Sequence, residues 1–160
     1  MRFILGACLL SGLSSFAGQS DNLRVHVRVK PSCRIKSYHP THWSVLSGIF
    51  NANIDNSSGS IVTQCTRGIF YTVGLNNGEH YDSMAQSRRL ADNHGHYVNY
   101  AVFSDPGFSR PWLSVGTPYA LPLVGEGHDQ TSILYARIPQ GQNPTPAGHY
   151  ADSIMVSIHF

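Results

Sequence analysis

The chain has 160 residues and a formal net charge of +2, with charged residues at only 12%. This length fits one domain with a core of its own, and the near-neutral charge argues against nucleic acid as a partner. Aromatic residues favour strands, while Asn and Gly favour turns, so the abundance of Tyr, Phe, Ser, Asn and Gly disfavours a fold of long helices.

Residues 1–17 are predicted to be a secretory signal peptide. Met1-Arg2 supply a positive start, Phe3–Leu13 are apolar apart from small residues, and Ser15-Phe16-Ala17 place small residues where signal peptidase cleaves. We expect cleavage after Ala17, with Gly18 as a second candidate. The apolar stretch is too short for a membrane span. The alternative is a buried strand or helix.

Residues 23–30 alternate between apolar and polar over eight positions. Successive side chains of a strand point to opposite faces. The apolar face consists of Leu23, Val25, Val27 and Val29, and the polar face of Arg24, His26, Arg28 and Lys30. The segment is either a strand that inserts into another molecule or the first strand of an ordinary sandwich. A basic patch for nucleic acid or membrane is a third interpretation, disfavoured because no second cluster of charges accompanies it.

Two cysteines remain once the signal peptide is removed, Cys33 and Cys65, because Cys8 lies within it. One pair of cysteines in an exported chain most simply forms one disulfide. A closed loop of about 33 residues corresponds to roughly 3–4 kcal/mol of stabilisation in the chain-entropy model. Two free thiols or a metal site are the alternatives, although zinc needs four ligands.

Further strands are predicted along the rest of the chain. They cover residues 60–65, 69–75, 97–103, 132–138 and 153–160, with turn signals and prolines between them. On the last strand, Ile154, Val156, Ile158 and Phe160 share one face. No helical period, linker or repeat is present. Short strands at this spacing predict a single-domain antiparallel sandwich.

Several motifs together resemble the spore coat protein U domain. The segments Tyr135–Gln142 and Pro146–Phe160 are similar to the characteristic end of that family, Tyr-x-Arg-Ile-Pro-x-Gln followed by Pro-x-Gly-x-Tyr-x-Asp and an alternating strand. Earlier pieces resemble the family in the same order. They are Cys65–Gly68, Tyr71–Asn76, Arg88–Leu90, and Asn99-Tyr100 with Asp105 and Trp112. The resemblance covers residues 23–160.

The resemblance implies a subunit of an archaic chaperone–usher pilus, with a role in adhesion or biofilm formation. Its fold would be an incomplete immunoglobulin-like antiparallel β-sandwich that lacks its last strand. Residues 18–31 would hold the donor strand (Leu23, Val25, Val27, Val29), and residues 32–160 the sandwich. The strand with Ile154, Val156, Ile158 and Phe160 would border the open groove. A periplasmic chaperone fills that groove first, and the next subunit's donor replaces it at the outer-membrane usher, giving a head-to-tail polymer on the cell surface.

The alternation of residues 23–30 suits this role on physical grounds. A strand from another chain can satisfy both the unpaired backbone and the apolar surface of an open sheet edge. Burying four such side chains is worth roughly 6–12 kcal/mol gross. The alternatives are a monomeric secreted coat or matrix protein whose N-terminal strand fills its own groove, and a carbohydrate-binding sandwich.

Other kinds of site have little support in the sequence. His39 with His42, and His94 with His96, are the closest histidine pairs, but the surroundings of the second pair predict a solvated turn. No phosphate loop, nucleophile elbow or zinc-protease motif occurs, so we expect no enzyme, catalytic residue, metal or cofactor. Four aromatic residues could stack on sugars but are more typical of a core or its rim: Trp43, Tyr81, Trp112 and Tyr119.

Overall fold

The computed structural model describes residues 19–43 and 49–160, which form an all-β structure. The strands are β1 (Cys33–His39), β2 (Ile54–Cys65), β3 (Phe70–Leu75), β4 (Arg88–Ala91), β5 (Tyr97–Phe103), β6 (Leu121–Val124), β7 (Asp129–Ile138) and β8 (Val156–His159). No helix occurs in the described part of the chain, and so none that is long and apolar enough to cross a membrane.

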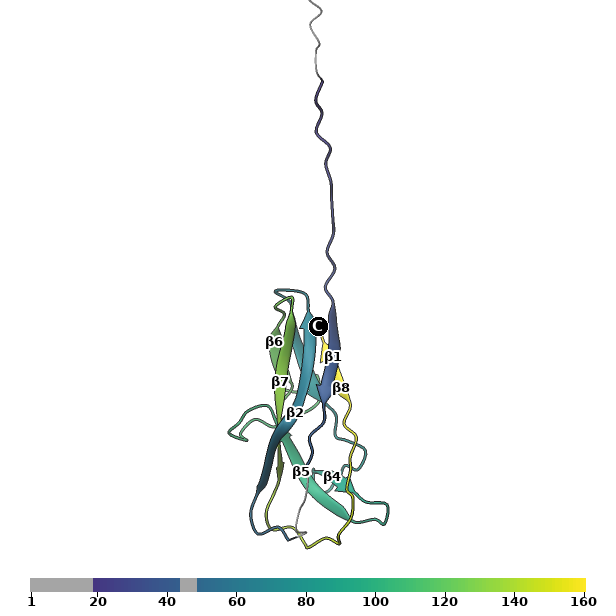
Figure 1. Cartoon of the computed structure of the whole chain (residues 1–160), viewed down its shortest axis with the longest axis vertical. Coiled ribbons are helices and arrows are strands. Elements are labelled where there is room, and N and C mark those ends of the chain that lie inside the picture. The colour runs from purple at the N-terminus through teal and green to yellow at the C-terminus, as the bar shows by residue number, and fades with distance from the viewer. Residues whose placement is uncertain (1–18, 44–48) are drawn as a thin grey trace, which may run out of the picture.

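The strands form two antiparallel sheets (Figure 1). One sheet has five strands in the order β1-β2-β7-β5-β4, and the other has three in the order β6-β3-β8. The core between them includes Ile61, Val73, Val102, Trp112 and Ile138, each at most 3% exposed. The predicted all-β antiparallel fold is therefore confirmed, and the predicted strands 60–65, 69–75, 97–103, 132–138 and 153–160 overlap β2, β3, β5, β7 and β8.

The structure contradicts one of the three interpretations of the alternating segment 23–30. It belongs to neither sheet, so it is not an ordinary first strand of this sandwich. That position is taken by β1, which pairs with β2 from Cys33↔Cys65 to His39↔Ser60. Figure 1 shows residues 19–32 running straight away from the sandwich.

Two sheet edges lie next to each other and are not paired. β1 is bonded only to β2 and β8 only to β3 among the described residues, and β1 and β8 approach each other across the open side of the sandwich. β1 runs from the disulfide end, and β8 runs towards it, with Phe160 beside the start of β1 (Figure 1). This open side is where a further strand could be added.

Candidate functional site

The N-terminal segment, residues 19–31, is exposed throughout. The four apolar side chains Leu23, Val25, Val27 and Val29 are 73–91% exposed. Such exposure of a row of aliphatic side chains is unusual, because each would stabilise the fold if it were buried. The alternation predicted from the sequence thus lies on a segment with no partner strand among the described residues of its own sandwich.

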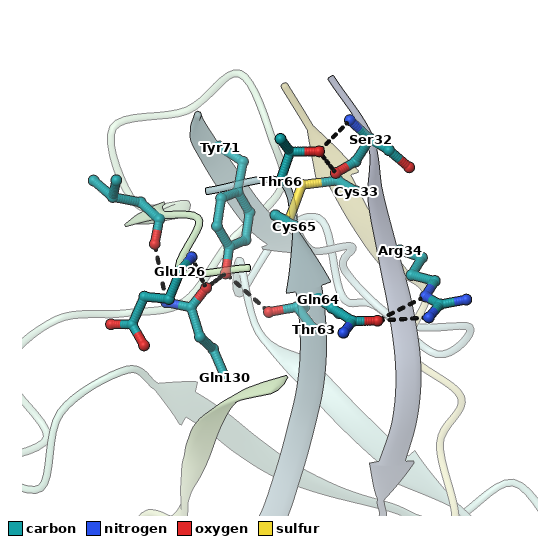
Figure 2. The surroundings of a disulfide bond; sticks show 11 residues. Ser32, Cys33, Arg34, Thr63, Gln64, Cys65, Thr66, Tyr71, Glu126 and Gln130 are labelled. Carbon is teal, nitrogen blue, oxygen red and sulfur yellow. Dashed lines mark hydrogen bonds between the residues drawn. A yellow bond between two sulfur atoms is a disulfide. The ribbon is translucent and has the colours of Figure 1, made fainter. Parts of the chain in front are cut away.

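The exit of this segment from the sandwich is fixed by hydrogen bonds at Ser32. Its backbone N–H donates to Thr66 Oγ1 at 3.0 Å, and its carbonyl accepts from the Thr66 backbone N–H at 2.8 Å. Figure 2 shows this pair beside the disulfide. The free part of the chain therefore ends at Pro31, immediately before the anchored residues.

The disulfide between Cys33 and Cys65 is present, as predicted. It joins the first residue of β1 to the last residue of β2, and Cys65 is 2% exposed. Arg34 Nε donates to Gln64 Oε1 at 3.1 Å in the next pair of the ladder (Figure 2). The bond thus holds β1 to the five-stranded sheet at the end where the N-terminal segment leaves.

The open side between the sheets is lined by apolar side chains, which we call the β1–β8 seam: Ile35, Tyr38, Ile154, Val156, Ile158 and Phe160. Ile35 and Tyr38 lie opposite the buried Thr63 and Ile61 in the β1–β2 ladder and so face the interior, yet Tyr38 is 70% exposed. Phe160 is 57% exposed. An inward-facing side chain with the exposure of Tyr38 shows that the core is uncovered along the seam.

On β8, the predicted groove residues Val156 and Ile158 occupy the inner face, while Ile154 precedes the strand and Phe160 follows it. Ile158 lies opposite Val73 and Val156 opposite Leu75, and both partners on β3 are at most 1% exposed. Ile154, Val156 and Ile158 are partly buried and pack against the core. The structure thus places three of the four predicted groove residues against the core at this edge, with Phe160 exposed after β8. Their contact with a partner strand stays a prediction.

Arg88 binds the main chain at the end of β3, which lies beside the start of β8. Its guanidinium donates to the carbonyl oxygens of Leu75, Asn76 and Trp112 at 2.6–3.0 Å, and the residue is 5% exposed. Asn76 in turn bonds Met155 through its backbone N–H and its side-chain oxygen. Burial lowers the pKa of the Arg88 guanidinium, opposed by the charges of Tyr100 and Asp152.

A buried carboxylate anchors the residues before β8. Asp152 has a fully buried side chain that accepts hydrogen bonds from the Tyr100 hydroxyl at 2.6 Å and the Glu79 backbone N–H at 2.9 Å. Burial, together with the bond to Asp152, raises the pKa of Tyr100 far above its usual range. Gly78 has φ +81°, and a Cβ there would lie 2.1 Å from Asp152 Oδ2, so the turn requires glycine.

The histidine pair His94 and His96 lies in a turn, as its surroundings predict. Asp92 organises the turn by accepting from the backbone N–H groups of both residues, and His96 Nδ1 lies 2.7 Å from Asp92 Oδ2. Burial alone would raise the pKa of Asp92, but these hydrogen bonds outweigh it and hold the pKa well below its usual range. Within residues 19–43 and 49–160, no group of three or more potential ligands could hold a metal ion.

The four candidate sugar-stacking aromatics are scattered. Trp112 is fully buried and donates from Nε1 to the Val73 carbonyl at 2.8 Å. Trp43 packs edge-to-face against Tyr100, with ring centroids 6.3 Å apart. Tyr119 is 51% exposed, and Tyr81 lines a depression of about 350 Å³ beside Arg88 and Tyr100. The fold therefore does not bring the four rings into one stacking platform.

One side of the seam was missing from the sequence predictions. Ile35 and Tyr38 of β1 are three positions apart, and the register of the β1–β2 ladder shifts between Ile35 and Ser37. The bulge places both on the inner face, whereas strict alternation would put them on opposite faces. The only sequence signal available was Cys33, which fixes the start of a strand opposite Cys65.

Comparison with protein families identifies the class of protein that this architecture defines. The family model described as the Spore Coat Protein U domain matches residues 19–157, which is nearly the whole chain. The chain belongs to this family, as the motifs between Cys65 and Phe160 indicated. A search of curated proteins found no match.

Two solved structures are similar to the chain. The first is a chain of the CsuC–CsuE chaperone–tip adhesion subunit pre-assembly complex from archaic chaperone–usher Csu pili of Acinetobacter baumannii, with 21% identity and a TM-score of 0.50. The match covers 82% of this chain and 40% of that one. The second is HdaB, the Hda pilus minor tip subunit of E. coli, at 14% identity and a TM-score of 0.46, covering 78% of this chain and 79% of that one. At 21% identity the first likeness shows a shared fold; our chain spans less than half of that protein.

Proposed function

We propose that the chain is a structural subunit of a surface pilus, exported to the periplasm and assembled by a chaperone and an outer-membrane usher. Residues 23–29 act as the strand that completes the sandwich of a neighbouring subunit. The observation that carries the proposal is the pairing of two unsatisfied features: a free strand segment with four exposed aliphatic side chains and an uncovered apolar seam between β1 and β8.

Each feature supplies what the other lacks. A strand placed along β8 would pair with its free backbone edge and cover Tyr38 and Phe160 of the seam. The strand's four aliphatic side chains point to one face, as insertion between two sheets requires. Their burial is worth roughly 6–12 kcal/mol gross, before the cost of ordering the segment.

The direction of the chain favours a linear polymer. The N-terminal segment leaves its sandwich at the disulfide end, towards which β8 runs (Figure 1). A segment that enters a neighbour antiparallel to β8 therefore has Lys30 at the opposite end of that neighbour, so the two sandwiches follow each other along one line. Each subunit then offers one segment and one seam, and such head-to-tail contacts do not close.

A monomer that fills its own seam would require a sharp reversal of the chain just before β1. Ser32 is already bonded to Thr66, so the chain would have to reverse at Lys30-Pro31 to bring residues 23–29 back beside β1. In the structure the segment makes no ladder with β1 or β8. We therefore place the polymer first and keep the self-closed coat protein as the second candidate.

Peptide complementation tests the proposal. A variant that lacks residues 19–30 should aggregate or be degraded when it is produced alone, because its seam stays uncovered. A synthetic peptide of residues 19–31, or the cognate chaperone, should keep it soluble in a one-to-one complex. A peptide with Val27→Asp should not rescue it, whereas a peptide with Arg28→Asp should. A soluble, well-folded monomer without any added strand would contradict the proposal.

A further inference from the structure

We infer that the polar face of the N-terminal segment, once the segment is inserted into a neighbouring sandwich, forms a basic stripe that binds an acidic polysaccharide. The stripe consists of Arg24, His26, Arg28 and Lys30. The inference rests on the proposed function, because insertion fixes the segment and leaves this face in solvent.

The charges of the chain are divided between the segment and the sandwich. Residues 19–34 carry four cationic side chains and one acidic side chain, Asp21. From residue 35 onwards the acidic side chains outnumber the lysines and arginines by eight to six. The chain therefore combines a basic N-terminal segment with a slightly acidic sandwich, although its formal net charge is only +2.

The acidic side chains of the sandwich are mostly occupied by partners within it. Asp55 binds Arg137 at 2.6 Å, Asp82 binds Arg89 at 3.1 Å, and Asp129 lies 3.8 Å from Lys36. Asp92 contacts His96, Glu126 contacts His128, and Asp152 contacts the Tyr100 hydroxyl. Asp105 accepts hydrogen bonds from the backbone N–H groups of Ser109 and Arg110. Among the described residues of the sandwich, only the Glu79 carboxylate has no such partner, so most of these carboxylates are held by groups of their own domain.

The neighbours of an inserted segment would also leave the stripe unpaired. β8 contributes no acidic residue, and its outward-facing side chains are Ser157 and His159. β1 has no acidic residue either and adds Arg34, whose guanidinium bonds the neutral Gln64. A cation row flanked by neutral or basic residues attracts anions more strongly than one interleaved with carboxylates.

The spacing of the stripe suits a linear polyanion of moderate charge density. Alternate residues of a strand lie about 6.4–6.8 Å apart. Arg28 and Lys30 are therefore separated by about that distance, and Arg24 and Arg28, on either side of the neutral His26, by about twice that distance. Duplex DNA carries one charge per about 1.7 Å, a much denser lattice. Each further subunit repeats the stripe along the fibre, and multivalent contact with a long chain raises apparent affinity. A uronic-acid polysaccharide fits these properties better than duplex DNA.

The test uses assembled fibres of the full chain and compares two variants that lose the same charge. In Arg24→Gln/Arg28→Gln the stripe is weakened. In Arg67→Gln/Arg110→Gln two exposed arginines of the sandwich are removed instead, whose guanidinium groups bind no carboxylate in the described part of the chain. Binding to immobilised polygalacturonate is measured at low and high salt, with fully methyl-esterified polymer and duplex DNA as the other ligands. A multimer ladder on an unheated denaturing gel reports assembly separately.

Wild-type fibres and the sandwich control should bind polygalacturonate alike, in a salt-sensitive manner. The stripe variant should lose at least tenfold in apparent affinity while its ladder persists. Equal losses in both variants, equal binding of the esterified polymer, or binding of duplex DNA in preference to polygalacturonate would each overturn the stripe. If wild-type chains give no ladder, the proposed function fails and the inference with it; an intact ladder without polysaccharide binding refutes the inference alone.

Discussion

Arg88 is a buried cation whose hydrogen bonds go to main-chain carbonyls of three residues, Leu75, Asn76 and Trp112. A guanidinium can do this because its N–H groups form a rigid planar fork. The bonds connect the end of β3 with the chain that enters the core at Trp112, and Asn76 extends the connection to Met155. The position of β8, and therefore one wall of the seam, depends on this side chain.

Replacing Arg88 with Met should destabilise the sandwich by about 2–4 kcal/mol, because several buried carbonyl groups lose their donors. The measurement is urea unfolding of the peptide-complemented domain. Arg110→Met is the matched control, since that side chain is exposed, and its effect should stay within about 0.5 kcal/mol. A loss for Arg88→Met no larger than the control would show that Arg88 does not hold β8.

Several carboxylates of the sandwich are stabilised in their ionised form. The hydrogen bond from Arg137 lowers the pKa of Asp55, and hydrogen bonds in the 92–96 turn lower that of Asp92. A carboxyl group whose pKa is lowered by folding contributes stability above its unfolded pKa of about 4, and this contribution is lost as the pH falls towards the folded value.

The melting temperature of the peptide-complemented domain should therefore fall as the pH is lowered from about 5 to 2. Asp92→Asn cannot ionise, so its melting temperature should be lower than that of the wild type at pH 6, and the difference should shrink in acid. Calorimetry at a series of pH values measures both effects. A wild-type melting temperature that rises below pH 4, or a difference that stays constant, would contradict this assignment.

At the scale of elements, β1 connects the free segment to the sandwich, and the disulfide fixes its first residue. Replacing both Cys33 and Cys65 with Ala should cost roughly 3–4 kcal/mol in the chain-entropy model, since the closed loop of the unfolded chain is opened. Urea unfolding of the complemented domain measures the loss. Mass mapping of the exported protein should show one linked pair of peptides, and alkylation of both cysteines without reductant would contradict the assignment.

The strands that could be predicted are those with clean alternation or β-branched runs. Residues 97–103 were predicted with the bounds of β5, and 69–75 differ from β3 by one residue. β6 was missed because Pro122 interrupts it, which an edge strand tolerates. The first half of β2 was missed because Asn56, Ser57 and Ser58 give a turn-like composition, and its register shifts between Asn56 and Gly59.

In the whole molecule, the free segment and one side of the seam could be predicted from the sequence, and the other side could not. The alternation of residues 23–30 and of residues 154–160 identified the free segment and the β8 side of the seam. The β1 side depends on a bulge that no periodicity reveals, and Arg88 is buried at a position where a basic residue would be expected on the surface. Residues 1–17, the predicted signal peptide, lie outside the described residues.

In the proposed polymer, residues 23–29 of one subunit fill the β1–β8 seam of the next. Val27→Asp would place a carboxylate without a partner in that seam, at a cost of several kcal/mol. Arg28→Asp changes the neighbouring residue on the solvent-facing side and leaves the apolar face intact. The two substitutions therefore separate the inserted face from the exposed face of the same segment.

The decisive measurement is the multimer ladder of surface material on an unheated denaturing gel. The ladder should disappear for Val27→Asp and persist for Arg28→Asp, while both variants keep their complex with the chaperone, which would occupy the seam and not the segment. If Val27→Asp leaves the ladder intact, the segment does not join the subunits. If it abolishes the chaperone complex as well, the segment belongs to the subunit's own fold, and the self-closed monomer becomes the better account.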